Sequence, residues 1–166
     1  MEIYLVRHGA AYDKEDDPER HLNRDGVSQC HLTGRALKRL DIQFDLIVSS
    51  PIARARQTAE IIAEETGYSR AEIKITEKLE PTVLPNETLS YLNDFADVKR
   101  ILLVGHLPLL GYLASELLIN TSQIQFYFEP ASVCKINTEQ PRAFAGDFCW
   151  FLAQEHIRII GQVPDI

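Results

Sequence analysis

The sequence has few cysteines and no long apolar run, and these absences exclude several classes of protein. Cys30, Cys134 and Cys149 are an odd number and form no Cys-x-x-Cys pair, so neither a zinc site nor a disulfide framework is indicated. We expect all three to be buried, reduced thiols. No stretch approaches the roughly 20 apolar residues that span a bilayer, and no signal peptide is visible at the start. The expected compartment is therefore the cytoplasm.

Positive charge is also scarce. Lysine and arginine number 17 against 24 aspartates and glutamates, which gives a net charge of -7. This balance argues against nucleic acid or an anionic membrane as the main partner. Any anion site must then be local and built from a few arginines. The chain of 166 residues, 45% of them hydrophobic, suits one globular domain over residues 1–166, with a core that needs no metal or disulfide.

Hydrophobic periodicity predicts strands that alternate with helices, followed by strands alone. The predicted strands are Ile3–Val6, Phe44–Ser49, Glu72–Thr76, Arg100–Val104, Gln123–Phe128, Ser132–Ile136 and Phe148–Ala153. The predicted helices begin after the N-cap residues Asn23 and Ser50, at Glu87, and at Pro108. Strand–helix units followed by strands indicate an α/β fold whose mostly parallel sheet has an antiparallel edge.

Two of the predicted strands end in a small residue and a histidine. Ile3–Val6 is followed by Arg7, His8 and a glycine, and Arg100–Val104 is followed by a glycine and His106. Because ligands bind beyond the carboxyl ends of strands in an open α/β sheet, we expect both histidines at one edge of the sheet. A guanidinium beside an imidazole at such a place indicates an anion, and phosphate above all.

The strand Phe44–Ser49 brings further arginines to the same edge. Ser50 and Pro51 begin a helix whose first turns carry Arg54 and Arg56, and helix N-termini attract anions. Each feature alone has a bland interpretation, since a lone histidine is usually a core or surface residue and an early helical arginine is usually solvated. Their joint occurrence predicts a phosphate site.

Together these residues resemble the histidine phosphatase superfamily, the phosphoglycerate mutase-like proteins. The resemblance rests on Arg7-His8-Gly9, on Ser50-Pro51-Ile52-Ala53-Arg54-Ala55-Arg56-Gln57-Thr58-Ala59 and on Gly105-His106. A second stretch is similar to the family's L-T-x-x-G-x-x-Q helix start, with Asn23 where threonine is commoner; it comprises Leu22-Asn23-Arg24-Asp25-Gly26, Gln29, Gly34 and Leu37. The match runs from residue 2 to about residue 118.

Within this superfamily, the short chain and the stretch Gly105–Leu113 resemble the SixA-type phosphohistidine phosphatases. The resemblance implies a three-layer α/β/α domain with a mostly parallel sheet, in a minimal form without a large cap insertion. The C-terminal strands fit the family topology less specifically.

The resemblance implies that His8 is a nucleophile that forms a phosphohistidine intermediate, which water then hydrolyses. Arg7, Arg54 and His106 are expected to bind the phosphate and stabilise charge on its equatorial oxygens, since guanidinium groups suit paired phosphate oxygens. Positive charge beside His8 would lower its pKa and keep the imidazole neutral for attack. No metal or other cofactor is required, and no carboxylate cluster suggests one.

Helical periodicity does not determine whether Arg54 or Arg56 binds the phosphate. The family pattern S-x-x-x-R-A-x-x-T-A selects Arg54, four residues after Ser50, and leaves Arg56 as a surface residue. Arg20, two residues before Leu22, matches a SixA-type arginine that adds a phosphate contact. Its bland interpretation is that it balances charge in an acidic loop.

The sequence does not determine which residue, if any, acts as the general acid. Larger superfamily members place an acid beyond the third strand, and Glu80 falls in the corresponding loop, where SixA-like sequences often have L-T-P. Glu80 is either that acid or, as we favour, a solvated loop charge. An imidazole with a pKa of roughly 6.5 is protonated near neutral pH and leaves uncharged, so a site without a committed acid favours phosphohistidine over alkyl phosphates.

Three functions follow from these residues. The favoured one is a phosphohistidine phosphatase that acts on a phosphorelay protein of two-component signalling, such as a histidine-containing phosphotransfer domain, because no insertion is long enough to form a lid over the site. The first alternative is a small-molecule phosphomonoesterase that works through Glu80. The second is a non-catalytic phosphoprotein-binding module, which an intact His8 disfavours because binding needs no nucleophile.

Overall fold

A mixed sheet of six strands forms the centre of the computed structural model, which describes residues 1–119 and 126–162. The strands lie in the order β3-β2-β4-β1-β5-β6. Their bounds are β1 Glu2–Arg7, β2 Leu46–Ser49, β3 Lys74–Ile75, β4 Arg100–Gly105, β5 Val133–Thr138 and β6 Gly146–Leu152. The first four strands are parallel, whereas β5 runs antiparallel to both β1 and β6. The predicted α/β fold with a mostly parallel sheet and antiparallel pairing at one side is confirmed.

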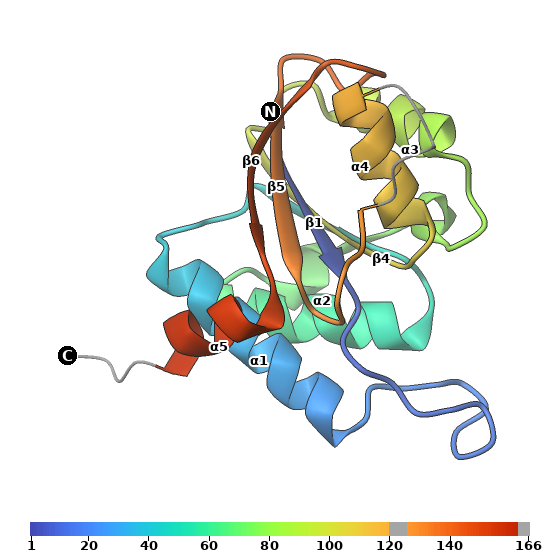
Figure 1. The fold of residues 1–166 in the computed structure, drawn as a ribbon, viewed down its shortest axis with the longest axis vertical. Helices are drawn as coiled ribbons and strands as arrows, with labels where there is room; N and C mark the ends of the chain where they lie inside the picture. Colours follow the sequence, from blue (N-terminus) through green and yellow to red (C-terminus); the bar gives the residue numbers. More distant parts are fainter. Residues whose placement is uncertain (120–125, 163–166) are drawn as a thin grey trace.

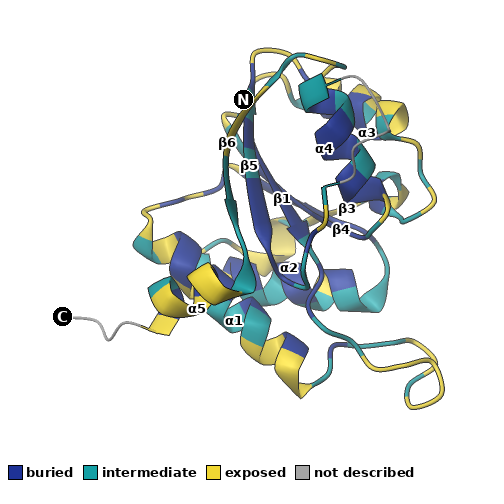
Figure 2. Ribbon diagram, viewed as in Figure 1, coloured by how far each residue is buried: buried dark blue, intermediate teal, exposed yellow. Residues whose placement is uncertain are grey.

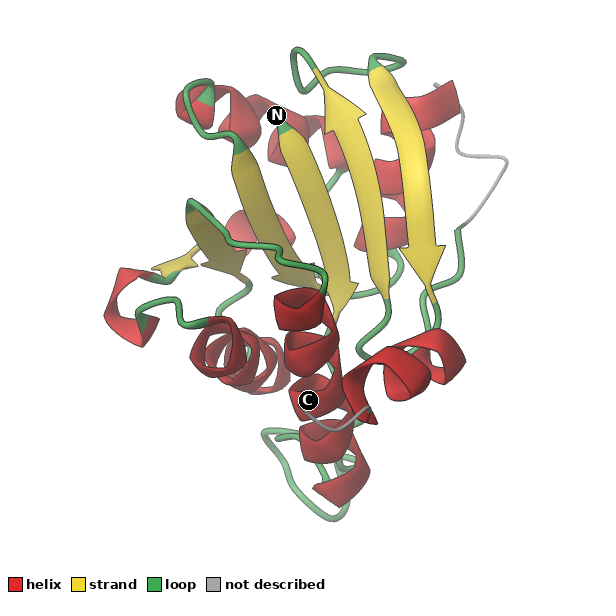
Figure 3. Cartoon of the chain, turned by 90° about the vertical axis from the view of Figure 1, so that its left-hand side faces the viewer, coloured by secondary structure: helices red, strands yellow, loops and turns green. Residues whose placement is uncertain are grey.

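Helices cover both faces of this sheet (Figures 1 and 3). The α-helices are α1 Arg24–Arg39, α2 Ala53–Thr66, α3 Pro85–Leu92, α4 Leu109–Ile119 and α5 Gln154–Gln162. Short 3-10 helices are η1 Arg70–Glu72, η2 Glu77–Leu79 and η3 Asn93–Phe95. Helices α3 and α4 pack on one face, and α1, α2 and α5 pack on the other. The arrangement has three layers.

The alternation of side chains along β1 divides the core into two parts. Ile3 and Leu5 contribute to the cluster beneath α3 and α4, whereas Tyr4 and Val6 contribute to the cluster beneath α1, α2 and α5. All four residues are at most 1% exposed. Figure 2 shows most of β1 and β4 in the colour of buried residues. A strand buried on both faces carries apolar residues without polar alternation, which is the pattern that predicted it.

The helix ends show which capping residues the sequence identifies correctly. Asn23 caps α1, and its side-chain oxygen accepts a hydrogen bond from the Gly26 N–H over 2.9 Å. Helix α2 ends at Gly67 with a φ of 76°, in the left-handed region that glycine tolerates. The prediction that Ser50 is the N-cap of α2 is wrong, because Ile52 occupies that position. The Ser50 hydroxyl lies instead beside a histidine described below.

Several predicted elements differ from the structure in length or kind. The third strand has two residues rather than five, and α3 begins at Pro85 rather than Glu87. Of the predicted strand 123–128, residues 123–125 lie outside the described residues, and residues 126–128 are not a strand. Helix α5 was not predicted. Its first N–H, on Gln154, donates to a carboxylate oxygen of Glu129 over 3.0 Å, a tertiary contact that has no local sequence signal.

The three cysteines do not share one environment. Cys30 and Cys134 are buried, and burial raises the pKa of the Cys30 thiol to about 11 and that of Cys134 to about 12. Cys149 lies exposed on β6, so the expectation of a buried thiol is wrong there. No helix within the described part of the chain is long and apolar enough to cross a membrane.

Candidate active site

The register of the sheet brings the three predicted strand ends together. In the parallel pairs, Arg7 of β1 lies opposite Gly105 of β4, and Ser49 of β2 lies opposite Val104. The next residue of each strand therefore leaves the sheet at the same edge. The His8 N–H donates to the Gly105 carbonyl over 3.1 Å and continues the ladder by one bond.

The His8 imidazole is fixed at both ring nitrogens. Its Nδ1 lies 2.7 Å from the Gly9 carbonyl oxygen, and its Nε2 lies 3.1 Å from Nε of Arg54. A carbonyl can only accept and a guanidinium N–H can only donate. Nδ1 therefore carries the proton, and Nε2 presents its lone pair to Arg54. A neutral imidazole with a free Nε2 lone pair is the form that can attack phosphorus.

Burial and positive charge both keep His8 neutral. The residue is 9% exposed. Its pKa is lowered from 6.5 to about 4, by burial first and then by the charges of Arg54, Arg7 and Arg20, which together outweigh the raising effect of the hydrogen bond to Gly9. The same causes act on Arg54, whose pKa is lowered by burial and by the charges of Arg20 and Arg7. The site thus concentrates positive charge in a protein of net charge -7.

His106 lies beside His8, with their ring centroids 5.0 Å apart. It is 1% exposed, and its pKa is lowered from 6.5 to about 3 by burial first and then by His8, Arg54 and Arg7. Its Nε2 forms a 2.9 Å hydrogen bond with the Ser50 hydroxyl. Its buried Nδ1 has no hydrogen-bond partner among the described residues.

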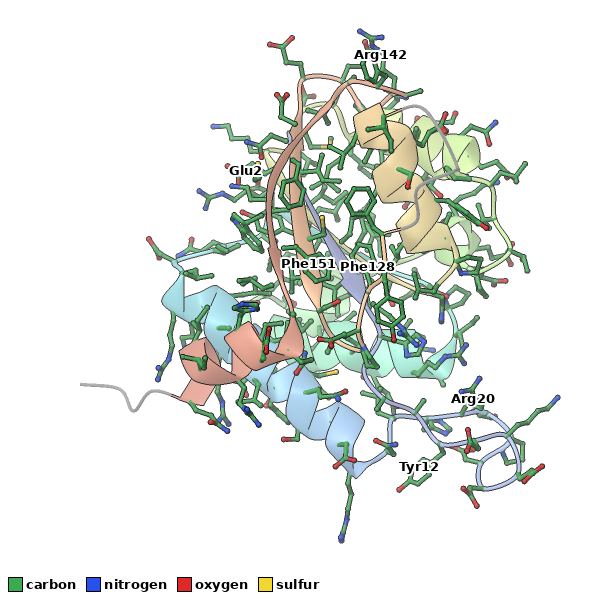
Figure 4. All side chains as sticks on the ribbon, viewed as in Figure 1. Glu2, Tyr12, Arg20, Phe128, Arg142 and Phe151 are labelled. Carbon is green, nitrogen blue, oxygen red and sulfur yellow. The ribbon has the colours of Figure 1, made fainter. Side chains whose placement is uncertain are left out.

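Arg7 extends from the end of β1 to a segment far away in the sequence. One of its terminal N–H groups donates to the Phe128 carbonyl over 2.7 Å. Phe128 is labelled in Figure 4. The Ala131 N–H donates back to the Arg7 carbonyl over 3.0 Å. The buried Nε of Arg7 has no partner within residues 1–119 and 126–162, and an anion is the species that an unpaired guanidinium donor binds.

The two candidate arginines of α2 occupy different environments. Arg54 is partly buried and contacts His8, whereas Arg56 is exposed and lies 3.8 Å from Glu60 in an (i, i+4) pair. The structure places Arg54 in the site and Arg56 on the surface.

Arg20 is held in a turn beyond β1 (Figure 4). Its φ is 54°, in the left-handed region, and its Nε donates to the Tyr12 carbonyl over 3.0 Å. The Asp17 carboxylate accepts hydrogen bonds from the N–H groups of Glu19 and His21 and fixes the turn around Arg20. The charge of Arg20 lowers the pKa of both His8 and Arg54.

Glu80 follows a residue that packs on the end of β4, at the same edge of the sheet. It follows η2, and the carbonyl oxygen of the preceding Leu79 would lie 3.2 Å from a methyl built on Gly105, the last residue of β4. The Glu80 carboxylate has no hydrogen bond or ion pair with any residue that the structure describes. No group of three His, Cys, Asp or Glu side chains within the described ranges is arranged to hold a metal ion.

Two residues without a predicted role connect the segments of the site. The Thr58 hydroxyl donates to the Arg54 carbonyl over 2.7 Å and accepts from the Gly9 N–H over 3.1 Å. The Gln29 side-chain oxygen accepts from the Ala10 N–H over 3.0 Å. Gln29 and Thr58 both belong to the stretches that resemble a family pattern, and this resemblance was the only sequence feature that could have indicated a role for them. No sequence feature indicated a role for the Phe128 carbonyl.

Comparison with known proteins gives matches over most of the chain. The sequence profile described as the histidine phosphatase superfamily (branch 1) matches residues 3–81. The phosphohistidine phosphatase SixA of Escherichia coli is 30% identical over 120 residues, which cover 70% of this chain and 74% of that protein. A SixA homolog of Haemophilus influenzae is 31% identical over 145 residues, 82% of this chain and 87% of that protein.

A solved structure, that of the protein histidine phosphatase SixA complexed with tungstate, has the same fold. It superposes with a TM-score of 0.84 over 95% of this chain and 99% of that chain, at 24% sequence identity.

Proposed function

The chain belongs to the histidine phosphatase superfamily, as a SixA-type phosphohydrolase, and on that basis we propose that it removes phosphate from phosphohistidine in a protein substrate. The observation that carries the proposal is the state of His8. Its Nδ1 is protonated against Gly9, its Nε2 lone pair is directed at Arg54, and its pKa of about 4 keeps it neutral at pH 7. A binding site needs no such nucleophile.

In the first step, His8 Nε2 attacks the phosphorus of the substrate phosphohistidine. A new P–N bond forms as the bond to the substrate imidazole breaks, and that imidazole leaves with the electron pair. Arg54 must release Nε2 as the phosphate enters, and we propose that its N–H groups then bind phosphate oxygens. Arg7, Arg20 and His106 provide further positive charge or donors for the phosphate, which is the main contribution that an enzyme makes to phosphoryl transfer.

In the second step, water attacks the phosphorus of phosphorylated His8. The P–N bond breaks, the electron pair returns to Nε2, and phosphate leaves with the oxygen and both hydrogens of the water molecule, one of which is then released to solvent near neutral pH. The charge of Arg7 and Arg54 again stabilises the equatorial oxygens in the transition state. The proposed roles need neither a metal nor another cofactor.

The leaving group supports phosphohistidine rather than an alkyl phosphate as the substrate. An imidazole departs uncharged after protonation near neutral pH, whereas an alkoxide needs a proton from a positioned acid. Among the described residues, the Glu80 carboxylate forms no hydrogen bond or ion pair that would hold it at the site. The two relatives at 30% and 31% identity also bear the name of phosphohistidine phosphatase. We propose a cytoplasmic phosphorelay protein, such as a histidine-containing phosphotransfer domain, as the substrate.

A small-molecule phosphomonoesterase is the second candidate. The Leu79 carbonyl packs on Gly105 at the end of β4, which places the next residue, Glu80, at the edge of the sheet that carries His8 and His106. In that function, Glu80 would protonate the leaving oxygen. Glu80→Gln would then lower the turnover of alkyl monoesters by roughly 10²-fold or more and leave phosphohistidine hydrolysis unchanged.

The decisive experiment measures hydrolysis of a phosphohistidine-bearing protein domain against a panel of alkyl and aryl phosphate monoesters. We expect strong preference for the phosphohistidine domain, loss of activity in His8→Ala, and full activity in His156→Ala, which removes an exposed histidine of α5. Quenching with acid is unsuitable because phosphohistidine is acid-labile. The phosphorylated enzyme should therefore be trapped under alkaline conditions.

Faster turnover of alkyl monoesters would favour the Glu80-dependent esterase. Binding of the phosphoprotein without phosphate transfer to His8 would identify a non-catalytic binding module and reject both enzymes.

A further inference from the structure

The peptide group between Gly9 and Ala10 is held from both sides. Its carbonyl oxygen accepts the Nδ1 proton of His8 over 2.7 Å, and its N–H, on Ala10, donates to the side-chain oxygen of Gln29 over 3.0 Å. Gln29 lies on α1, and the function proposed above gives it no role.

The direction of these hydrogen bonds is determined by chemistry. The Ala10 N–H can only donate, so the Gln29 amide must present its oxygen rather than its NH₂ group. The Gly9 carbonyl can only accept, so the His8 proton must be on Nδ1. One peptide group therefore transmits the orientation of Gln29 to the protonation pattern of His8.

Close packing allows this peptide to approach α1. A methyl group built on Gly26 would lie 1.9 Å from the Ala10 carbonyl oxygen, and one built on Gly9 would lie 2.7 Å from the Cys30 sulfur. The absence of side chains at these two positions brings the backbone within reach of Gln29. The Asn23 N–H adds a hydrogen bond to the Ala10 carbonyl over 3.0 Å.

We propose that Gln29 is a positioning residue that fixes His8 in the tautomer with Nδ1 protonated and the Nε2 lone pair free. Without the Gln29 acceptor, the Ala10 N–H loses its partner and the Gly9–Ala10 peptide loses its fixed orientation. Rotation of that peptide removes the acceptor from Nδ1 and leaves the Arg54 N–H at Nε2 as the one remaining contact that opposes the other tautomer. The proton then resides part of the time on Nε2, which in that form cannot attack phosphorus. The proposal relies on His8 as the nucleophile but not on which phosphate ester or phosphoramidate is the substrate.

The kinetic test compares three variants on α1. Gln29→Met has a similar length and no acceptor at the position of the amide oxygen, Gln29→Glu keeps an acceptor, and Ser28→Ala changes an exposed neighbour. We expect Gln29→Met to lower kcat about 10- to 100-fold, as misplacement of a reacting group does, with KM changed less than about twofold. Gln29→Glu should recover most of kcat, and Ser28→Ala should match the unmodified protein. Thermal unfolding checks that each variant folds.

The tautomer is measured directly from imidazole ¹⁵N shifts at pH 7, where His8 is neutral. Its signal among the five histidines is assigned by its loss in His8→Ala. We expect a protonated Nδ1 and an unprotonated Nε2 in the unmodified protein, and a mixture of both tautomers in Gln29→Met. Protonated Nε2 in the unmodified protein, or a Gln29→Met variant that loses kcat with an unchanged tautomer, would overturn the proposal. So would a mixed tautomer with full kcat.

The ¹⁵N measurement needs no substrate, so it separates this proposal from the proposed function. An unmodified protein that fails to hydrolyse phosphohistidine rejects the proposed function alone. The tautomer of His8 in the two Gln29 variants still decides the role of Gln29.

Discussion

Gly9 is tied to Thr58 by a hydrogen bond of 3.1 Å from its N–H to the threonine hydroxyl. The same hydroxyl donates a hydrogen bond to the Arg54 carbonyl over 2.7 Å, and its oxygen lies 3.4 Å from the Cys30 sulfur. A single buried oxygen thus joins the segment that carries His8 to the helix that carries Arg54. Their relative position depends on it.

Replacement of Thr58 should therefore affect both stability and activity. Thr58→Val keeps the shape but leaves the Gly9 N–H buried without an acceptor, which costs about 1–3 kcal/mol of unfolding free energy. We expect a lower kcat as well, since His8 and Arg54 lose their common anchor. Thr58→Ser retains the hydroxyl and should retain most of the activity. Urea unfolding and steady-state kinetics measure the two effects, and equal behaviour of the valine and serine variants would contradict the prediction.

Arg54 and Arg56 form a matched pair for mutagenesis on one helix. Arg54→Ala should lower kcat/KM by roughly 10²–10³-fold, the usual effect of removing one donor that stabilises transition-state charge. Arg56→Ala removes an exposed pair with a 3.8 Å separation and should change kcat/KM less than about twofold. An NMR titration should also show a higher His8 pKa in Arg54→Ala, because the Arg54 charge lowers it. A larger kinetic effect at Arg56 would reverse the assignment.

The lowered histidine pKa values predict that the protein loses stability on acidification. The pKa of His8 is about 4 in the folded protein against 6.5 in the unfolded chain, and that of His106 is about 3. Below pH 6.5 the unfolded chain binds protons that the folded protein does not, so unfolding becomes easier as the pH falls toward 4. The contribution of His8 is on the order of 3 kcal/mol.

Urea unfolding at pH 7.5 and pH 5 measures this loss. We expect a smaller difference between the two pH values in His8→Ala, which lacks one of the two groups. Equal pH dependence in the variant and the unmodified protein would show that His8 is not responsible.

Asp17 should act on phosphate binding through Arg20. Its carboxylate lies 3.1 Å from the Glu19 N–H nitrogen and 2.8 Å from that of His21, and these bonds lower its pKa and close the turn that holds Arg20 at a φ of 54°. We expect Arg20→Ala to raise KM about tenfold, as loss of a charged hydrogen bond does. Asp17→Asn should raise KM less, and Asp16→Asn, an exposed neighbour, should have no effect. Equal KM values for all three variants would remove Arg20 from the site.

The strand ends were the part of the site that the sequence predicted best. A buried parallel strand needs an uninterrupted apolar run, and residues that follow such runs must meet at one edge of the sheet. His8 and His106 could therefore be placed together without knowledge of the strand order. The separation of Arg54 from Arg56 needed the family pattern, because both lie in the same turns of α2.

The contacts that depend on packing between distant segments could not be predicted. The Ser50 hydroxyl has the local signal of a helix cap, but its bond to His106 exists only once β2 and β4 are adjacent. Arg7 reaches the carbonyl of Phe128, 121 positions away, a residue that the apolar pattern assigned wrongly to a strand. Helix α5 is similarly connected to Glu129 at its first turn. Such bonds depend on chain geometry rather than on residue type.

The central position of β1 has a consequence for the order in which the molecule assembles. The strand that delivers His8 is synthesised before both of its neighbours in the sheet, which are residues 100–105 and 133–137. During translation, one backbone edge of β1 stays unpaired until β4 emerges, which ends 98 residues after Arg7 (105 − 7). The other edge waits for β5, which begins 126 residues after Arg7 (133 − 7). Contacts of such long sequence separation slow folding and expose strand edges to aggregation. The site can therefore form only after β5 has emerged, and the appearance of activity in a nascent chain would report that β1 has paired with both of its neighbours.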